Sequence, residues 1–373
     1  MSFGSRLKWA REAAGLTQKQ LSEATEIGIS SISEFENDVR DPSALQMVTI
    51  GEAVRRRPDF FYQVGEPEKE VVLWREKPAD DSAQIELKLI ELSGQFQRLE
   101  QCVGNPTICE IPFASSGSRL FQYTDAERLA HEFRKSHALG ERPGSSLLRV
   151  LEEVCRVKVF HLPFEPSGTA ACTLNDGYGA AILLNSNNVR WRRNFDLAHE
   201  LFHLLTWKIF RVGANADQAT EQEEKFANCF AGSLLVPPEP LKLSVASQLN
   251  GKKSLDFDDL FEIARQFDVS VQALVWQMVS NKLIEKSNAA EMLGKIGGRV
   301  EQWEKRQDET RPSTRPIRFE ALAREAIEKG MIGTGVFAKY MGLSRRAAMK
   351  IIETEIYTGM EYQANAEVEI TDS

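Results

Sequence analysis

The sequence is poor in the features that mark secreted, membrane-embedded or zinc-ribbon proteins. Its five cysteines are scattered and form no CxxC pair, so neither a disulfide framework nor a zinc ribbon is indicated. No stretch approaches about 18 consecutive apolar residues, and the first residues lack the hydrophobic region of a signal peptide. We therefore expect a cytoplasmic protein with reduced thiols and no membrane-spanning helix.

Positive charge and histidine are also scarce. The chain has 46 basic and 54 acidic residues, a net charge of −8, so it is not a general nucleic-acid binder and any DNA contact must be local. Only five of the 373 residues are histidines. In contrast, a hydrophobic content of 42% and a charged content of 27% are ordinary for a folded protein, and the length predicts two or three domains.

The order of helix, strand and turn signals predicts a mainly α protein with one small α+β domain, whose strands are expected near 157–160 and 180–184. An all-helical N-terminal domain comes first, then a linker with an amphipathic helix, then the mixed domain, and last a helical region with an acidic tail. The apolar stripe of the linker helix must be covered, either by a neighbouring domain or by a second copy in a homodimer. The predicted ranges are 1–63, 64–122, 123–290 and 291–373, and the stripe consists of Ile85, Leu89, Leu92, Phe96 and Leu99.

A series of turn, core and capping residues lies near the N-terminus. The sequences Arg-x-x-x-Gly-Leu-Thr-Gln from Arg11, Ile-Ser-x-Phe-Glu-Asn from Ile32 and Arg-Asp-Pro-Ser from Arg40 together resemble the Cro/repressor-like (XRE-type) helix-turn-helix family. The resemblance implies a compact helical domain that binds operator DNA by setting a helix at about 28–37 in the major groove. It also implies a phosphate contact from one residue and base contacts from four others, which are Gln18 and then Ile29, Ser30, Ser33 and Glu34.

The charge of this N-terminal module is unusual for a DNA reader. The third helix region contains no Lys or Arg and carries Glu34, Glu36 and Asp38, and residues 1–60 hold eight basic against nine acidic residues. Because phosphate contacts dominate affinity, we expect DNA binding that is weak, salt-sensitive or dependent on a dimer. A helix-turn-helix used for protein contact is the alternative.

The sequence His-Glu-Leu-Phe-His begins at His199, inside an apolar helix predicted at about 194–207. A spacing of four residues places His199 and His203 on one helical face, where both can bind one Zn2+ ion at about 2.0–2.1 Å. Glu200 would project beside the open metal position, take a proton from water there and pass it to a leaving amine. Buried histidines without such a task would need other polar partners.

A catalytic zinc ion usually has a third protein ligand, and a second predicted helix offers one. Glu224 follows His203 by 21 positions and lies on the flank of a helix whose other face is apolar, and Glu223 is the runner-up ligand. Asn228, one turn beyond Glu224, could hydrogen-bond the second nitrogen of a ligand histidine and fix its tautomer.

These two stretches, Leu-Ala-His-Glu-Leu-x-His from Leu197 and Glu-x-x-Ala-Asn-x-Phe-Ala from Glu224, resemble the ImmA/IrrE family of metallo-endopeptidases. The resemblance covers roughly residues 125–290. It implies a zincin fold, a zinc ion on His199, His203 and Glu224, and Glu200 as the general base. Phe202 stands where the family often has glycine, so its bulky side chain either narrows the cleft or packs inside.

A peptide substrate needs a binding edge and an electrophile. The strand expected at 178–185, just before the metal-binding helix, would line the cleft, and an extended peptide could pair with its edge. An electrophile for the tetrahedral oxyanion is needed as well. Its candidates are Tyr178, His161 and His137, each of which can instead be a packing or surface residue.

The C-terminal region gathers positive charge. Residues 315–350 carry eight basic residues against three acidic ones, and the sequence from Phe337 to Arg346 has the rhythm of a helix-turn-helix. This region is therefore either a second element that contacts DNA or a partner, or a solvated basic face.

Two functions of different classes fit these observations. The first is a DNA-binding transcriptional regulator fused to a zinc-dependent endopeptidase that cleaves a regulatory protein such as a repressor. The second is a non-proteolytic transcriptional regulator, or an antitoxin-like protein, whose zincin domain senses a metal or a ligand. The implied cofactor is Zn2+, and the implied partners are operator DNA, a protein substrate and a second copy in a homodimer.

Overall fold

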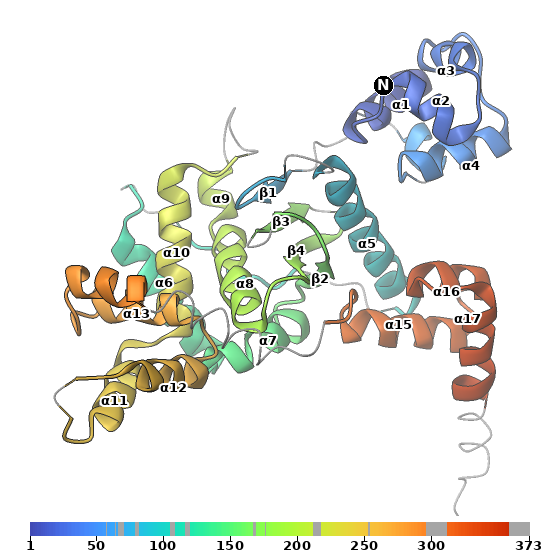
Figure 1. The fold of residues 1–373 in the computed structure, drawn as a ribbon. Helices are drawn as coiled ribbons and strands as arrows, with labels where there is room; N and C mark the ends of the chain where they lie inside the picture. The colour runs from blue at the N-terminus through green and yellow to red at the C-terminus, as the bar shows by residue number, and fades with distance from the viewer. Residues whose placement is uncertain are drawn as a thin grey trace, which may run out of the picture.

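The computed structural model has a mainly helical fold around one small sheet (Figure 1). The predicted fold class, mainly α with a small α+β part, is confirmed. Residues 66–70 of the predicted linker and the acidic tail beyond residue 357 lie outside the described residues. The structure describes residues 1–56, 58–63, 65, 71–78, 82–104, 109–115, 120–166, 169–175, 177–211, 218–252, 254–295 and 312–357.

The N-terminal residues fold into a helical unit with its own core. Its elements are α1 (Phe3–Ala13), α2 (Gln18–Thr25), α3 (Ile29–Glu36), α4 (Ala44–Ala53) and a 3-10 helix (Pro58–Tyr62). Thr17 and Ser43 begin α2 and α4 with capping boxes, in which the side-chain hydroxyl accepts from the backbone three residues on. Leu7, Ile32 and Phe35 are fully buried at the centre. Local capping and one apolar face per helix thus build this unit.

A four-stranded sheet forms the middle of the molecule. Its strands are β1 (Val72–Trp74), β2 (Lys158–Leu162), β3 (Ala170–Asn175) and β4 (Gly179–Asn185), in the order β1-β3-β4-β2. β3 pairs antiparallel with β1 and β4, whereas β2 runs parallel to β4. The sequence signals miss β1 and β3, because β1 has only three residues and β3 opens with two alanines rather than with β-branched residues.

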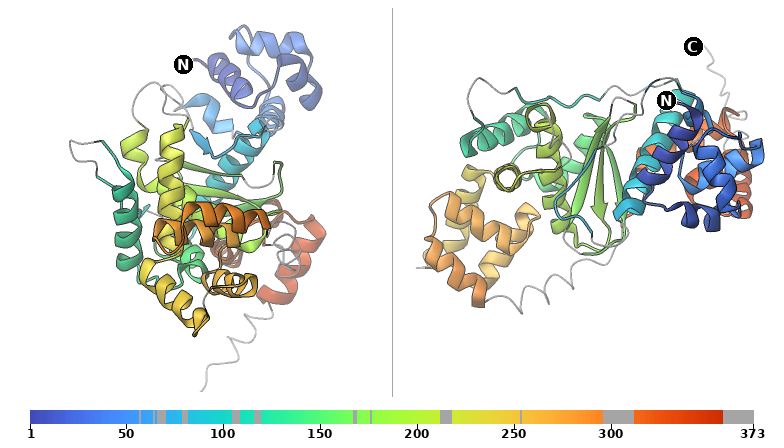
Figure 2. Two further views of the ribbon diagram at one scale, coloured as in Figure 1. Left: turned by 60° about the vertical axis from the view of Figure 1, so that its left-hand side comes forward. Right: turned by 90° about the horizontal axis from the view of Figure 1, so that it is seen from above.

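Both faces of the sheet are buried, as the alternation along β4 shows. Ile182 and Leu184 point into one hydrophobic core, whereas Ala181 and Leu183 point into another. The right-hand view of Figure 2 shows helices on both sides of the sheet. The sheet is therefore the middle of three layers, and each face has its own set of covering helices.

The first face is covered by the helices around the HExxH sequence. These helices are α6 (Tyr123–Ser136), α7 (Leu147–Glu153), α8 (Arg190–Leu205), α9 (Trp207–Phe210) and α10 (Glu221–Leu235), and the chain continues through α11 (Pro238–Leu249), α12 (Phe257–Phe267) and α13 (Val271–Ser280). α10 packs against both α6 and α8. No helix in the described ranges has the length and hydropathy of a membrane span.

The second face is covered by α5 (Ser82–Cys102) and by helices near the C-terminus, which are α15 (Ile317–Glu328), α16 (Thr334–Met341) and α17 (Arg345–Ile351). The predicted apolar stripe of α5 packs on this face. Phe96 contacts Phe160 of β2 and Phe319 of α15 edge-on, with ring centroids 6.4 and 5.5 Å away. The stripe is thus covered within the chain rather than by a second copy.

Candidate metal centre and nucleic-acid interface

The two histidines of the HExxH sequence lie in the buried half of α8. Every residue of α8 from Asp196 to Leu205 is buried, because the helix packs against the sheet on one side and against α10 on another. His199 and His203 are 0% and 2% exposed, and their Nε2 atoms lie 3.3 Å apart. An apolar helix thus carries two imidazoles into a core where polar groups need partners.

Glu224 of α10 completes a group of three donor atoms. Its Oε2 lies 3.0 Å from His199 Nε2, and its Oε1 lies 3.3 Å from His203 Nε2. Each of the three residues offers one donor atom within 4.8 Å of the other two. The structure therefore brings the three predicted ligands together, and two imidazole nitrogens with one carboxylate form a donor set that suits zinc.

The second nitrogens of both imidazoles face acceptors. His199 Nδ1 lies 3.2 Å from Asn228 Oδ1, and His203 Nδ1 lies 2.9 Å from Glu223 Oε1. A histidine that donates from Nδ1 presents the lone pair of Nε2, which is the atom in the three-donor group. Glu223, the runner-up ligand from the sequence, thus lies on the far side of His203, where Arg211 binds its other oxygen.

The electrostatics of this group favour a bound cation. Burial opposes the charge on His203, but the hydrogen bonds that its ring N–H groups donate to the carboxylates of Glu223 and Glu224 outweigh it and raise the pKa of His203 to about 9. Burial lowers the pKa of His199 to about 4, which keeps that imidazole neutral, as metal binding requires. The donor set and the excess of carboxylates both fit a divalent metal ion.

Glu200 differs from these residues because its carboxylate has no ion pair. Its side chain is fully buried, its oxygens accept no hydrogen bond of normal geometry from the described residues, and the weakly donating Cys172 thiol is the hydrogen-bonding group beside it. Burial raises the pKa of Glu200 to about 7. An unpaired acceptor in a core costs about 1–3 kcal/mol. Such a residue does not stabilise the fold, and a strongly shifted carboxyl of this kind is typical of a functional site.

Arg75, which no sequence signal indicates, also reaches this group. It follows β1 directly, and its Nη1 and Nη2 donate to Asp196 Oδ1 at 3.0 Å and to Asn228 Oδ1 at 3.3 Å. Asp196 is fully buried on α8, one turn before Glu200. Because Asn228 also contacts His199, Arg75 joins the edge strand β1 to both helices of the metal centre.

The prediction that the strand at 178–185 offers a free edge to a peptide is wrong. β4 lies between β3 and β2 and is hydrogen-bonded on both sides. The unpredicted strand β3 is the physical reason, because it fills the edge that the sequence leaves open. β1 is the edge strand beyond β3, and no other strand in the described ranges pairs with its outer side.

The three electrophile candidates make their contacts elsewhere. The Tyr178 hydroxyl lies 3.2 Å from Thr173 Oγ1, and His137 Nδ1 lies 3.0 Å from the carbonyl oxygen of Phe133. His161 is buried in β2, where burial lowers its pKa to about 4. Among the described residues, none of the three lies within hydrogen-bond distance of the metal-centre carboxylates or imidazoles.

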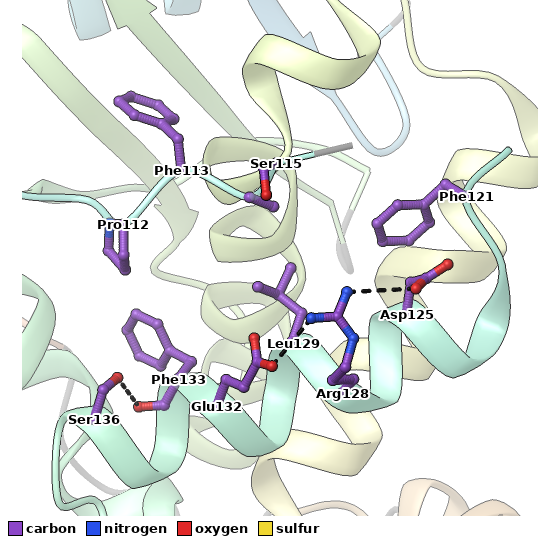
Figure 3. Close-up of a pocket in the computed structure, with 11 residues that line it drawn as sticks. Pro112, Phe113, Ser115, Phe121, Asp125, Arg128, Leu129, Glu132, Phe133 and Ser136 are labelled. Atoms are coloured by element: carbon purple, nitrogen blue, oxygen red, sulfur yellow. Dashed lines mark hydrogen bonds and ion pairs between the residues drawn. The ribbon is translucent and has the colours of Figure 1, made fainter. Parts of the chain in front are cut away.

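Phe202 packs inside rather than narrowing a cleft. Its side chain is fully buried, with ring centroids 5.8, 6.3 and 5.7 Å from those of Phe121, Phe210 and Phe230. Phe121 also lines a hollow between α6 and residues 112–115 (Figure 3). That hollow contains none of the three donor residues, so it is separate from the metal centre.

The predicted DNA-contacting residues lie on two helices of the N-terminal unit. Ile29 and Ser30 are exposed at the start of α3, and Ser33 and Glu34 are half-buried one turn on. Gln18 begins α2 and donates from Nε2 to Glu36 at 2.8 Å. Among the predicted contact residues, the two at the start of α3 are therefore the most exposed.

The acidic residues of this surface are already paired. Arg11 binds both oxygens of Glu36, at 2.6 and 3.1 Å, in a buried ion pair. Arg40 binds Glu34 at 3.1 Å. Asp38 accepts from the backbone N–H of Gly4 at 2.7 Å. The negative potential that a phosphate would meet is therefore smaller than the count of charges in the sequence indicates.

Comparison with known proteins gives two family matches on separate parts of the chain. Residues 4–57 match the model of a helix-turn-helix domain, and residues 152–277 match the IrrE N-terminal-like domain of Peptidase_M78. The chain thus joins a helix-turn-helix domain to an IrrE-like domain, and both resemblances drawn from the sequence are confirmed.

A curated relative and a solved structure that are similar to this chain give less information than the two family matches. The HTH-type transcriptional regulator ImmR of Bacillus subtilis (strain 168) is 38% identical over 61 residues, which are 16% of this chain and 48% of ImmR. The chain thus spans about half the length of this curated relative. The crystal structure of Bacillus thuringiensis PlcR in complex with the peptide PapR7 and DNA aligns over 98% of this chain and 99% of that chain, at 13% identity. Its TM-score of 0.16 is too low to inform the fold.

Proposed function

We propose that this protein is a DNA-binding transcriptional regulator with a zinc-dependent endopeptidase domain that cleaves a regulatory protein such as a repressor. The observation that carries the proposal is the convergence of His199, His203 and Glu224 beside the buried carboxylate of Glu200, which has no ion pair. The match to the Peptidase_M78 model supports the same activity.

In this proposal His199, His203 and Glu224 hold the zinc ion, and Asn228 and Glu223 orient the two imidazoles through Nδ1. When bound, zinc supplies Lewis-acid polarisation of water and of the scissile carbonyl. The Glu200 carboxylate accepts the proton of the attacking water and delivers it to the leaving amine nitrogen. An extended peptide adds to the outer edge of β1, the strand that Arg75 directly follows.

The DNA-binding part of the proposal uses the N-terminal unit. Ile29 and Ser30 at the exposed start of α3 face base edges, with Ser33 and Glu34 behind them, and Gln18 turns its amide from Glu36 to a phosphate on binding. Ser30→Glu places a negative charge on this surface and is expected to weaken operator binding, measured by fluorescence anisotropy. Glu23→Gln, an exposed change on α2, is the control and should leave binding unchanged.

The decisive experiment separates metal binding from catalysis. Zinc content measured by plasma mass spectrometry should be about one ion per chain, should be lost in His199→Ala, and should be retained in His131→Ala, which removes an exposed histidine. Glu200→Gln should keep its zinc but cleave a co-encoded repressor about 10²–10⁴-fold more slowly. Unchanged cleavage by Glu200→Gln would show that the peptidase proposal is wrong.

A second function has one observation in its favour. The donor group is deeply buried, since both histidines are buried and only Glu224 has a partly exposed side chain, at 23%. A metal held where a bulky peptide has little access suits a non-proteolytic regulator that senses a metal or a small ligand. In that case zinc removal should change operator binding, no co-encoded protein should be cleaved, and Glu200→Gln should behave as the wild type.

A further inference from the structure

The C-terminal helices repeat the backbone of the N-terminal helix-turn-helix. α2 and α16 each have eight residues, and each is followed by a residue in the left-handed conformation, Glu26 (φ 56°) and Gly342 (φ 67°). In both, the N-cap of the next helix stands two residues further on, at Gly28 and Ser344. The second helix then begins at Ile29 in α3 and at the equivalent position in α17. The two turns therefore correspond residue for residue.

The core positions and the preceding helix correspond as well. Leu21 and Phe337 occupy the same place in the first helix of each pair, and Ile32 and Ala348 in the second, and all four side chains are fully buried. α1 and α15 both end two residues before a left-handed glycine. α15, α16 and α17 thus follow the chain order of α1, α2 and α3, with one extra residue in the first loop. Of the two helices that follow it, α15 packs mainly on α16, whereas α1 packs mainly on α3, so the structural repeat is confined to the helix-turn-helix pair.

The outer face of α17 is cationic where that of α3 is neutral or acidic. The four positions expected to face base edges in α3 are Ile29, Ser30, Ser33 and Glu34, and their equivalents in α17 are Arg345, Arg346, Met349 and Lys350. All four α17 side chains are exposed, whereas two of the α3 residues are half-buried. The repeat therefore places three positive charges at the positions that a recognition helix presents to DNA.

These charges have no competing ion pair in the described part of the chain. Arg345, Arg346 and Lys350 lie within 4 Å of no carboxylate there, and Glu353 is the exposed acid one turn beyond. The inner side of the unit, by contrast, is fixed to the body. Arg318 of α15 binds Glu100 at 2.6 Å, and Tyr340 of α16 accepts from Arg98 at 2.8 Å. Figure 1 shows α17 at the outer margin of the molecule, and its three cationic side chains are exposed.

We propose that α15, α16 and α17 form a second DNA-binding unit in which α17 is laid in the major groove of duplex DNA. Arg345, Arg346 and Lys350 contact phosphates or base edges at the groove. The helix-turn-helix geometry and the complementary charge together favour duplex DNA over other polyanions. This unit is distinct from the N-terminal one, and the zinc centre plays no part in it.

The test uses the full chain and a fluorescein-labelled duplex of random sequence in a fluorescence anisotropy titration. Replacing Arg345, Arg346 and Lys350 together by Gln should weaken binding at least about tenfold at moderate salt. It should also lower the slope of log K against log salt concentration by roughly 2–3, because about 0.9 counterions are released per phosphate contact. The control replaces Lys135, Lys242 and Lys286 by Gln, which removes the same charge from exposed positions elsewhere and should change neither quantity.

Two further measurements keep the result decisive. Equal thermal midpoints of the two triple variants and the wild type show that each is folded. A photo-crosslinker on Met349→Cys should label duplex DNA, whereas one on Leu243→Cys, also exposed, should not. A triple α17 variant with the wild-type salt slope, or equal losses in the α17 and control variants, would overturn the proposal. If Ser30→Glu abolished binding while the triple α17 variant bound as the wild type, DNA would bind at the N-terminal unit and not at α17, and the proposal would be wrong.

Discussion

Two groups of buried charges lie on opposite faces of the sheet, and they differ in whether the buried carboxylate forms ion pairs. On the α5 side, the two oxygens of Glu100 face Lys158 at 3.2 Å and Arg318 at 2.6 Å. On the α8 side, the carboxylate of Glu200 is equally buried and forms no ion pair with any described residue. A buried charge held in ion pairs is consistent with a structural role, whereas one without an ion pair lowers stability and needs another reason to be there.

The largest expected effect separates these two glutamates. Glu100→Gln leaves Lys158 and Arg318 beside an uncharged group, and removing one member of a buried charge group costs about 3–5 kcal/mol. Glu200→Gln removes no ion pair, so its free energy of unfolding should stay within about 1 kcal/mol of the wild type. Urea unfolding of the metal-free chain measures both. Equal destabilisation by the two isosteric changes would contradict the contrast between the faces.

The next effect concerns the outer partners of the metal centre. Glu223→Gln weakens the acceptor that orients His203 and releases Arg211. Loss of such a partner lowers metal affinity by about 10–100-fold. Competition with a chromogenic chelator measures the zinc dissociation constant. Glu221→Gln, a fully exposed residue in the first turn of the same helix, is the control, and a similar loss there would remove the special role of Glu223.

A pH effect is expected at the other edge of the sheet. His161 lies on β2, where its backbone N–H donates to Thr314 at 3.1 Å, and burial lowers its pKa to about 4. The unfolded chain therefore binds a proton below about pH 6.5 that the folded chain rejects, so the free energy of unfolding falls from about pH 6.5 to pH 4. His161→Gln should flatten that fall, whereas His131→Gln, at an exposed site, should not.

The smallest expected effect is at Arg75. Its partner Asp196 is fully buried but keeps Arg192 and Asn188 as partners, so removal of the Arg75 ion pair should cost about 1–2 kcal/mol. Arg75→Ala should still affect function more than stability, because it frees β1 from Asn228 and α8. Zinc affinity and cleavage rate measure this effect. Lys77→Ala, on the same segment but paired with Glu86, should leave both unchanged.

The N-terminal unit and the metal-binding helix were readable in the sequence because their signals are local. Thr17 and Ser43 cap helices three residues ahead, and His199 and His203 meet across one helical turn. Helical spacing alone cannot predict that Glu224 lies near His203, since the distance between them depends on how α10 packs against α8. The spacing of the two motifs nevertheless indicates Glu224, which remains a proposed zinc ligand.

Other parts of the site had no such local signal. Arg75 lies in a stretch that the sequence describes only as linker, and it reaches the centre because β1 pairs with β3. The role of Glu223 as the partner of His203, rather than as a ligand, depends on the rotation of α10. Likewise, the pairing of Glu34 and Glu36 with arginines changes the meaning of the acidity counted along the N-terminal module.

The sequence alone was enough to determine where helices begin, which residues share a helical face, and how few histidines there are to bind a metal. The tertiary structure decided which strand has a free edge, which buried carboxylate has no ion pair, and that α16 and α17 repeat α2 and α3. The physical reason is the separation along the chain over which each interaction acts. Caps and helical spacing act over three or four residues, whereas strand order, burial and ion pairing depend on residues that are distant in the chain.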